Sequence, residues 1–217
     1  MQKRFTEASL LALLSLLMMQ SACGVAESPR TRYRPGRIEF DWSSHPSLAT
    51  DSRRTLEDRL DHDVEILIVK LQDVVITDAV VAANATSSPS FARRTALERR
   101  WKASEEGAGI VETHTDSACG RALELLVREH EDFEEIIVTD LRGLVVCQSR
   151  MAEHFFYGDE KWWRECVETG RLSHSRLVFD EATRSVGLSI FAPVRDPSTN
   201  DPIGVARAMV RRREVGG

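Results

Sequence analysis

The polar residues whose types suit ligand recognition gather on the strand expected at residues 173–180 (SHSRLVFD). Side chains alternate along a strand, which places His174, Arg176, Val178 and Asp180 on one face. Arg176 would bind a carboxylate through a forked pair of hydrogen bonds, and Asp180 would accept a hydrogen bond from an amine. A solvent-exposed strand face is the alternative, and it is the commoner fate of alternating polar residues.

Sequence patterns for catalysis and metal binding are missing. The chain has no GxSxG elbow, no HExxH pair, no P-loop and no GxGxxG after an expected strand. The run His130-Glu131-Asp132 lies at an expected helix end, where polar residues are common. The sequence therefore predicts a binding protein and not an enzyme, with no metal site and no cofactor.

Four cysteines occur without a CxxC spacing, which argues against a redox or zinc site. If Cys23 is modified, then Cys119, Cys147 and Cys166 remain, an odd number for a compartment that permits disulfides. One bond and one free thiol are expected, and all three pairings are open.

Length and charge limit the number of domains and the class of partner. The 217 residues suit one domain with a tail, and the net charge of −5 argues against a nucleic-acid partner. The basic clusters Arg93-Arg94, Arg99-Arg100 and 211–213 are short. We interpret them as solvated faces.

The N-terminus predicts export. A charged start and the apolar run 8–19 indicate a signal peptide over residues 1–23, because the run is too short to span a bilayer, which takes about twenty residues. Small residues before Cys23 resemble a lipoprotein cleavage site, which would make Cys23 the lipidated residue and anchor the chain to a membrane. Ordinary signal cleavage is the competitor. Residues 24–52, rich in proline and serine, are expected to form a tether in the periplasm or cell envelope.

The rest of the chain predicts an α+β domain over residues 53–212. Apolar spacings of three and four predict one long helix at 53–85. Further helices are expected at 90–102, after a break at 84–89, and at 116–131. The helical part therefore covers residues 53–131.

A sheet part at residues 132–212 follows. FEEIIVTDLRGLVVCQSR predicts a hairpin with Gly143 in its turn. GDEKWWRECVETG predicts a short helix with Asp159 as its N-cap and Gly170 as its left-handed end. Two alternating runs, SHSRLVFD and SVGLSIFAPV, predict strands joined by a polar turn.

These motifs together resemble extracytoplasmic sensor modules called Cache domains, which are PAS-like folds of the PDC type. The matching segments are VTDLRGLVV, GDEKWW, FDEAT, APVRD and IGVARAMV, within residues 133–210. The resemblance implies a long N-terminal helix packed on a PAS-like antiparallel sheet. It also implies a small ligand held between that sheet and the helix and loop that cover it.

The resemblance implies which residues contact the ligand. The loop would supply Phe156 and Tyr157, which close the site as a lid, and the helix would supply Asp159, Trp162 and Trp163. With the strand residues, the expected contacts are Tyr157, Asp159, Trp162, Trp163, His174, Arg176 and Asp180. Adjacent helical residues point about 100° apart, so at most one indole is expected to face the ligand while the other packs in the core.

The family's pattern for amino-acid recognition is incomplete in this chain. Lys161 directly precedes the tryptophan pair, Val178 stands where a tyrosine is usual, and the closing strand has no acid. A small carboxylate or another metabolite is therefore as well supported as an amino acid as the ligand.

The expected function is an extracytoplasmic small-molecule sensor. The chain stops at Gly217 without an output segment, so the bound state would pass to a separate membrane signalling protein. A homodimer is a further expectation. The alternative function is an envelope interaction or scaffold lipoprotein that senses nothing.

Overall fold

The computed structural model describes residues 50–104, 109–180 and 185–213, all within one compact unit, residues 32–217. Its helices are α2 (Thr50–Leu71), α3 (Val74–Asn84), α4 (Phe91–Lys102), α5 (Gly109–Thr115), α6 (Ala118–Glu129) and α7 (Lys161–Thr169). Its strands are β1 (Phe133–Asp140), β2 (Val145–Gln148), β3 (Ser173–His174), β4 (Val178–Asp180), β5 (Ser185–Arg195) and β6 (Pro202–Arg213). The expected signal peptide, Cys23 and the tether up to residue 49 lie outside the described residues.

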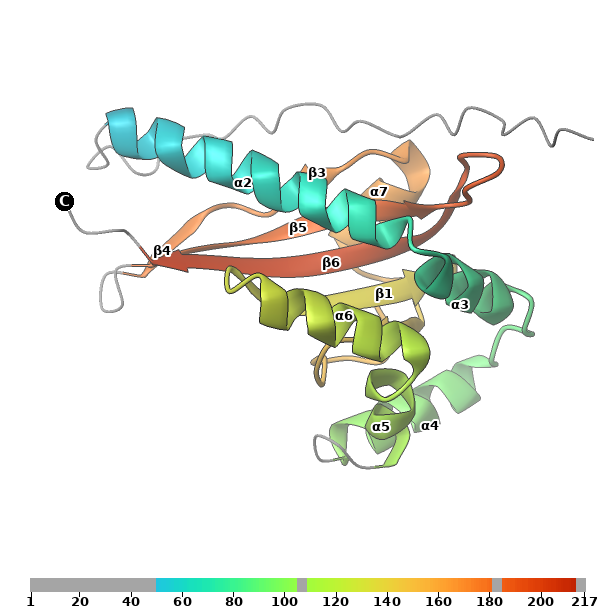
Figure 1. Cartoon of the computed structure of the whole chain (residues 1–217). Coiled ribbons are helices and arrows are strands. Elements are labelled where there is room, and N and C mark those ends of the chain that lie inside the picture. The colour runs from blue at the N-terminus through green and yellow to red at the C-terminus, as the bar shows by residue number, and fades with distance from the viewer. Residues whose placement is uncertain (1–49, 105–108, 181–184, 214–217) are drawn as a thin grey trace, which may run out of the picture. The chain divides into compact units, whose positions relative to one another are not determined.

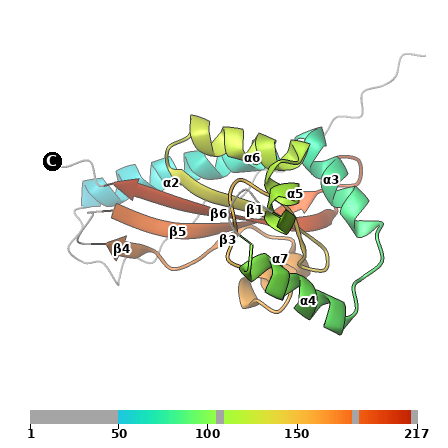
Figure 2. The same cartoon turned by 90° about the horizontal axis from the view of Figure 1, so that it is seen from below.

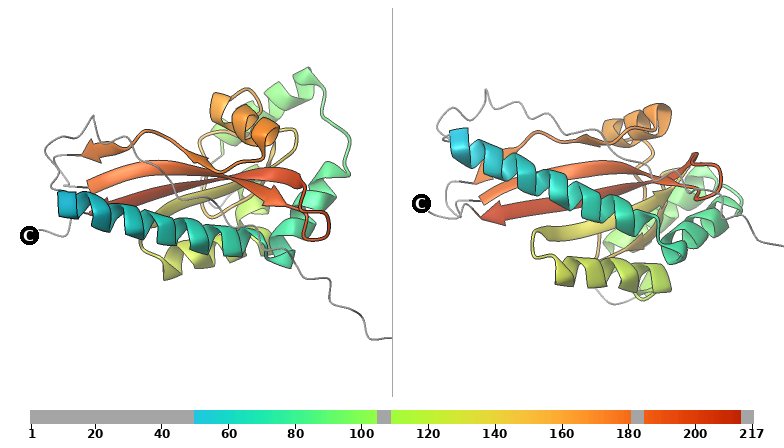
Figure 3. Two further views of the ribbon diagram at one scale, coloured as in Figure 1. Left: turned by 90° about the horizontal axis from the view of Figure 1, so that it is seen from above. Right: turned by 45° about the horizontal axis from the view of Figure 1, so that its top comes forward.

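The strands form one antiparallel sheet in the order β2-β1-β6-β5-β3, with β4 also paired to β5. Helices cover both faces: α2, α3 and α6 lie on one side, and α4 and α7 on the other (Figures 1 and 2). The first N-terminal helix, α2, runs along the sheet over β5 and β6 (Figure 3). The α+β class, with a long helix packed on an antiparallel sheet, is confirmed. None of the described helices is long and apolar enough to cross a membrane.

The N-terminal helix is divided, contrary to the prediction of one helix at residues 53–85. It ends at Leu71, and α3 begins after Asp73, whose side chain accepts a hydrogen bond from the Val75 amide at 3.1 Å. Aspartate is a strong N-cap, so it starts a new helix where the apolar stripe alone would continue. The short α5 was also not predicted.

The local turn and cap signals were mostly right. The helix expected from residue 90 starts there, with Ser90 as the N-cap of α4, Gly143 has φ 80° in the first hairpin, and Gly170 ends α7 with φ 60°. The predicted N-cap of α7 was wrong, because Glu160 occupies that position and Asp159 precedes it. The predicted single strand at residues 173–180 is two short strands, β3 and β4, separated by residues 175–177.

A disulfide joins Cys119 of α6 to Cys147 of β2, and Cys166 is free and buried. This selects one of the three pairings that the sequence left open. Burial raises the pKa of the Cys166 thiol to about 12, so this thiol stays protonated near neutral pH.

Reducing the disulfide should lower the free energy of unfolding by roughly 3 kcal/mol, because the bond constrains a loop with a sequence separation of 28 in the unfolded chain. Urea denaturation of the protein with and without reductant measures this loss. Cys119→Ala/Cys147→Ala should match the reduced protein, and Cys166→Ala should respond to reductant as the unaltered chain does. An unchanged urea midpoint after complete reduction would contradict the expectation.

The imidazole of His114 packs in an aromatic cluster with its ring centre 5.4 Å from that of Trp101 and 5.6 Å from that of Phe155. Burial lowers the pKa of His114 below its ordinary 6.5. The unfolded state therefore binds the proton more readily, and stability should fall as the pH drops through 6.5 toward the folded pKa. The urea midpoint should decrease as the pH is lowered across this range. In His114→Gln the urea midpoint should depend less on pH over the same range.

Candidate functional site

The face of the sheet covered by α7 carries a row of side chains across four strands. Phe191 of β5 lies opposite Arg207 of β6. Arg207 lies opposite Ile137 of β1, which pairs with Gln148 of β2. Paired residues share a face, and Ile137 packs in the same core cluster as Tyr157 and Trp163. The row therefore lies on the side of α7 and its preceding loop.

Arg207 holds the centre of this row. Its Nη2 donates to Glu135 Oε1 at 2.5 Å, and Arg150 Nε lies 3.8 Å from the other carboxylate oxygen of Glu135. Two cations thus face one buried acid. Within the described part of the chain, Arg207 Nε is buried and has no hydrogen-bond partner, and neither has Nε2 of the fully buried Gln148. Unmatched donors beside excess positive charge suit an anionic acceptor such as a carboxylate.

Aromatic side chains cover the row. Trp162 is partly exposed and stacks on Phe191, with ring centres 4.7 Å apart and planes 13° apart. Tyr157 lies 5.6 Å from Trp162, and the Arg207 guanidinium lies 5.2 Å from the Tyr157 ring centre. Stacked rings with a cation beside them form a flat apolar wall with one charged end.

Tyr157, expected as a lid residue, is only 1% exposed. Its hydroxyl accepts a hydrogen bond from the His154 amide at 3.3 Å. Burial raises the pKa of Tyr157 to about 12, so the phenol is neutral at physiological pH. The ring therefore forms part of the inner wall of the site.

Trp163 points into the core beneath α7. It is 7% exposed, and its Nε1 donates to Thr139 Oγ1 at 2.9 Å. Thr139 in turn donates to the carbonyl of Val205 at 3.0 Å. The two indoles thus separate as the helical geometry requires, with Trp162 at the surface and Trp163 inside.

The four remaining predicted contacts are Asp159, before α7, and three residues of the segment 174–180. Asp159 and Arg176 have exposed side chains. His174 is partly buried in β3, with Nδ1 2.7 Å from the carbonyl of Ser175. Asp180 lies in β4, and only its backbone is described. Residues 175–177 interrupt the strand. The alternation of side chains that was expected to place His174, Arg176 and Asp180 on one face is therefore broken.

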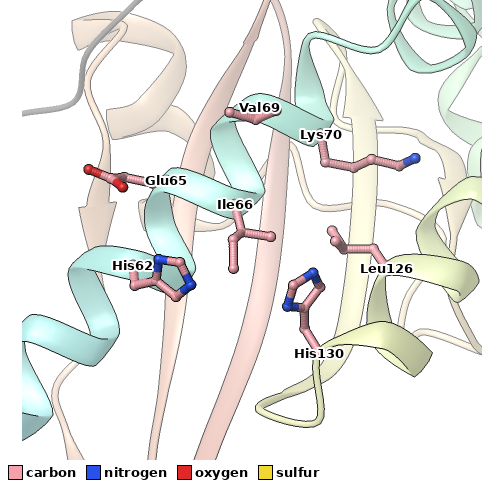
Figure 4. A pocket seen from close by; sticks show the side chains of 7 residues that line it. All are labelled: His62, Glu65, Ile66, Val69, Lys70, Leu126 and His130. Atoms are coloured by element: carbon pink, nitrogen blue, oxygen red, sulfur yellow. The ribbon is translucent and has the colours of Figure 1, made fainter.

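A groove of about 390 Å³ lies on the opposite side of the sheet, between α2 and α6 (Figure 4). Ile66, Val69 and Leu126 form its apolar part. The titratable residues along it are His62, Glu65, Lys70 and His130. None of the residues predicted to contact ligand lines this groove.

The sequence motifs did not identify four residues of this candidate site: Glu135, Arg150, Phe191 and Arg207. A charged residue inside an otherwise apolar strand was the available signal for Arg207, in IGVARAMV, and for Glu135, in FEEIIV. Lys, Glu, Arg and Asp are almost never buried unless they are paired, so two opposite charges in neighbouring strands indicate a buried pair.

No family model matches the chain, and no curated protein matches it. Several solved structures are similar to it at low identity. The ligand-binding domain of the Pseudomonas aeruginosa amino acid chemoreceptor PctC, in complex with GABA, is 15% identical over 75% of this chain and 58% of that one, with a TM-score of 0.39. The extracellular domain of the putative histidine kinase vpHK1S-Z8 is 13% identical over 74% of this chain and 54% of that one, with a TM-score of 0.43.

The ligand-binding domain of the Campylobacter jejuni chemoreceptor Tlp3, in complex with 4-methylisoleucine, is 13% identical over 76% of this chain and 61% of that one, with a TM-score of 0.32. The chain thus spans less than two thirds of the length of each of these structures. Two of the three are ligand-binding domains of chemoreceptors, and the third is the extracellular domain of a putative histidine kinase.

Proposed function

We propose that the chain is an extracytoplasmic sensor domain that binds a small anionic ligand on the α7 face of its sheet and presents the bound state to a separate membrane signalling protein. Arg207 carries this proposal. Its guanidinium is paired on one edge to Glu135, its Nε is unmatched among the described residues, and the Trp162–Phe191 stack stands beside it. A carboxylate with a flat or apolar body would satisfy the donor and pack against the rings.

The test is a thermal-shift screen of the full chain against a library of small carboxylates and other metabolites. A ligand at a hundredfold above its dissociation constant should add about 2.7 kcal/mol of stability. Arg207→Gln should remove the shift because the charged donor is lost, whereas Arg164→Gln, on the exposed side of α7, should keep it. A library that shifts nothing, or a shift that survives Arg207→Gln, would refute binding at this site.

Export, a lipid anchor on Cys23 and a homodimer belong to the same proposal. A lipid anchor would hold the sensor beside a membrane protein that reads it. Mass spectrometry of the N-terminal peptide from cells tests the anchor, and light scattering of the chain with and without ligand tests the dimer. An unmodified Cys23 removes the anchor and leaves the binding site standing.

The alternative function is an envelope interaction or scaffold protein. The packing of Trp163 favours it, because this half of the tryptophan pair fills the core instead of lining a space for ligand. A protein that responds to no metabolite but is retained by an envelope protein through α7 would support this alternative. Neither function includes a catalytic step.

A further inference from the structure

The solvent face of α4 carries positive charge and no acidic residue. Its exposed residues are Phe91, Ala92, Arg93, Thr95, Arg99, Arg100 and Lys102. Glu98, the one acid of the helix, is bound to the neighbouring loop: Oε1 lies 2.9 Å from His154 Nδ1, and Oε2 accepts from the Phe155 amide at 2.9 Å. The acid of α4 is therefore bound at the loop, beside Lys102, and pairs with none of the exposed arginines of the helix.

Little in the described part of the chain neutralises these cations. Lys102 lies 3.5 Å from Glu98, and no carboxylate there pairs with Arg93, Arg99 or Arg100. Glu105 and Glu106 follow in the sequence, outside the described residues. By contrast, the charged residues exposed on α6 are balanced: Arg121 and Arg128 against Glu124 and Glu129. The charge on α4 is thus local, in a chain whose net charge is −5.

An exposed aromatic ring stands at the start of the same helix. Phe91 is 75% exposed, and the Arg94 guanidinium lies 5.5 Å from its ring centre and 4.1 Å from that of Phe156. Cations at headgroup level with a phenylalanine that enters the acyl boundary are typical of surfaces that bind anionic membranes.

We propose that α4 is a docking surface for an anionic lipid bilayer. Arg93, Arg99, Arg100 and Lys102 would face the lipid phosphates, and Phe91 would enter the boundary between headgroups and acyl chains. This inference does not depend on the proposed function, because α4 contributes none of the residues that surround Arg207.

Vesicle binding by the full chain tests this proposal, with phosphatidylcholine vesicles that contain or lack phosphatidylglycerol. The readout is the partition coefficient for vesicles with phosphatidylglycerol divided by that for vesicles without it. The apolar N-terminus is the same in every variant, so its contribution cancels to first order when the variants are compared. Arg93→Gln/Arg99→Gln/Arg100→Gln should lower this ratio on the order of 100-fold, since each cation near an anionic surface contributes about 1 kcal/mol.

Matched variants separate the charge on α4 from charge elsewhere. Arg93→Lys/Arg99→Lys/Arg100→Lys should keep the ratio, and Arg121→Gln/Arg128→Gln on α6 should leave it unchanged. High salt should remove the preference for anionic vesicles in the unaltered chain, and Phe91→Ala should weaken binding at every salt concentration. An unaltered chain without preference for anionic vesicles, or a glutamine variant that keeps the preference, overturns the proposal. Binding to an acidic protein in place of vesicles would likewise overturn it.

Discussion

Arg212→Met should lower the free energy of unfolding by about 3–5 kcal/mol, because it leaves the buried carboxylate of Asp63 without its ion-pair partner. Arg212 of β6 is 8% exposed, and Asp63 of α2 is 2% exposed. Arg212 Nη2 lies 2.9 and 2.8 Å from the two carboxylate oxygens of Asp63, and its Nε donates to Oδ2 at 3.2 Å. This pair ties the first helix to the last strand of the sheet. Urea denaturation at neutral pH measures the loss.

The pH dependence of this variant follows from the pKa of Asp63. Burial raises that pKa, while the hydrogen bonds and charge of Arg212 lower it. Without Arg212 the folded pKa rises further above the unfolded value, so the folded state binds the proton more readily. The variant should then regain stability as the pH falls through the folded pKa of Asp63.

Asp63→Leu/Arg212→Met is the control for the same pair, because it removes the buried carboxylate together with the guanidinium. Asp132 Oδ2, which also lies 2.9 Å from Arg212 Nη2, loses its partner in both variants, and its side chain is 35% exposed to solvent. This double variant should be more stable than Arg212→Met. If Arg212→Met alone is as stable as the unaltered chain, the pair does not hold α2 to β6 as we infer.

Elements with strong local signals could be predicted from the sequence. The positive φ angles of Gly143 and Gly170 and the start of α4 next to Ser90 depend on chemistry within a few residues, and the structure has all three. The break before Asp73 was missed because the apolar periodicity of α2 continues into α3. Periodicity reports which face is buried and does not report where the helical hydrogen bonds are interrupted.

The candidate site was harder to predict, because its centre depends on strand register. Arg207 and Glu135 are 72 residues apart in the sequence and meet only because β1 and β6 are neighbours in the sheet. The predicted contact residues lie in the loop before α7, on α7 and on the two short strands after it, so they are close to one another in the chain. Strand order and register are set by the packing of the whole domain, which no local pattern contains.

Truncation of the two tryptophans of α7 should lower the stability of the domain by different amounts. Trp163→Ala should cost about 3–5 kcal/mol of stability, because it empties a buried site and removes the hydrogen bond from Nε1 to Thr139. Trp162→Ala should cost about 1–2 kcal/mol, since the ring is partly exposed and loses mainly its stacking on Phe191. Denaturation of both variants in urea measures these differences.

Ligand binding should show the reverse order. Trp162→Ala should abolish the thermal shift given by a ligand from the screen, because the wall beside Arg207 is lost. Trp163→Phe keeps most of the core volume, so it should fold and keep that shift. A shift that survives Trp162→Ala and disappears in the folded Trp163→Phe protein would place the ligand beneath α7 instead of beside the Trp162–Phe191 stack. That outcome would require the core around Trp163 to open when the ligand binds.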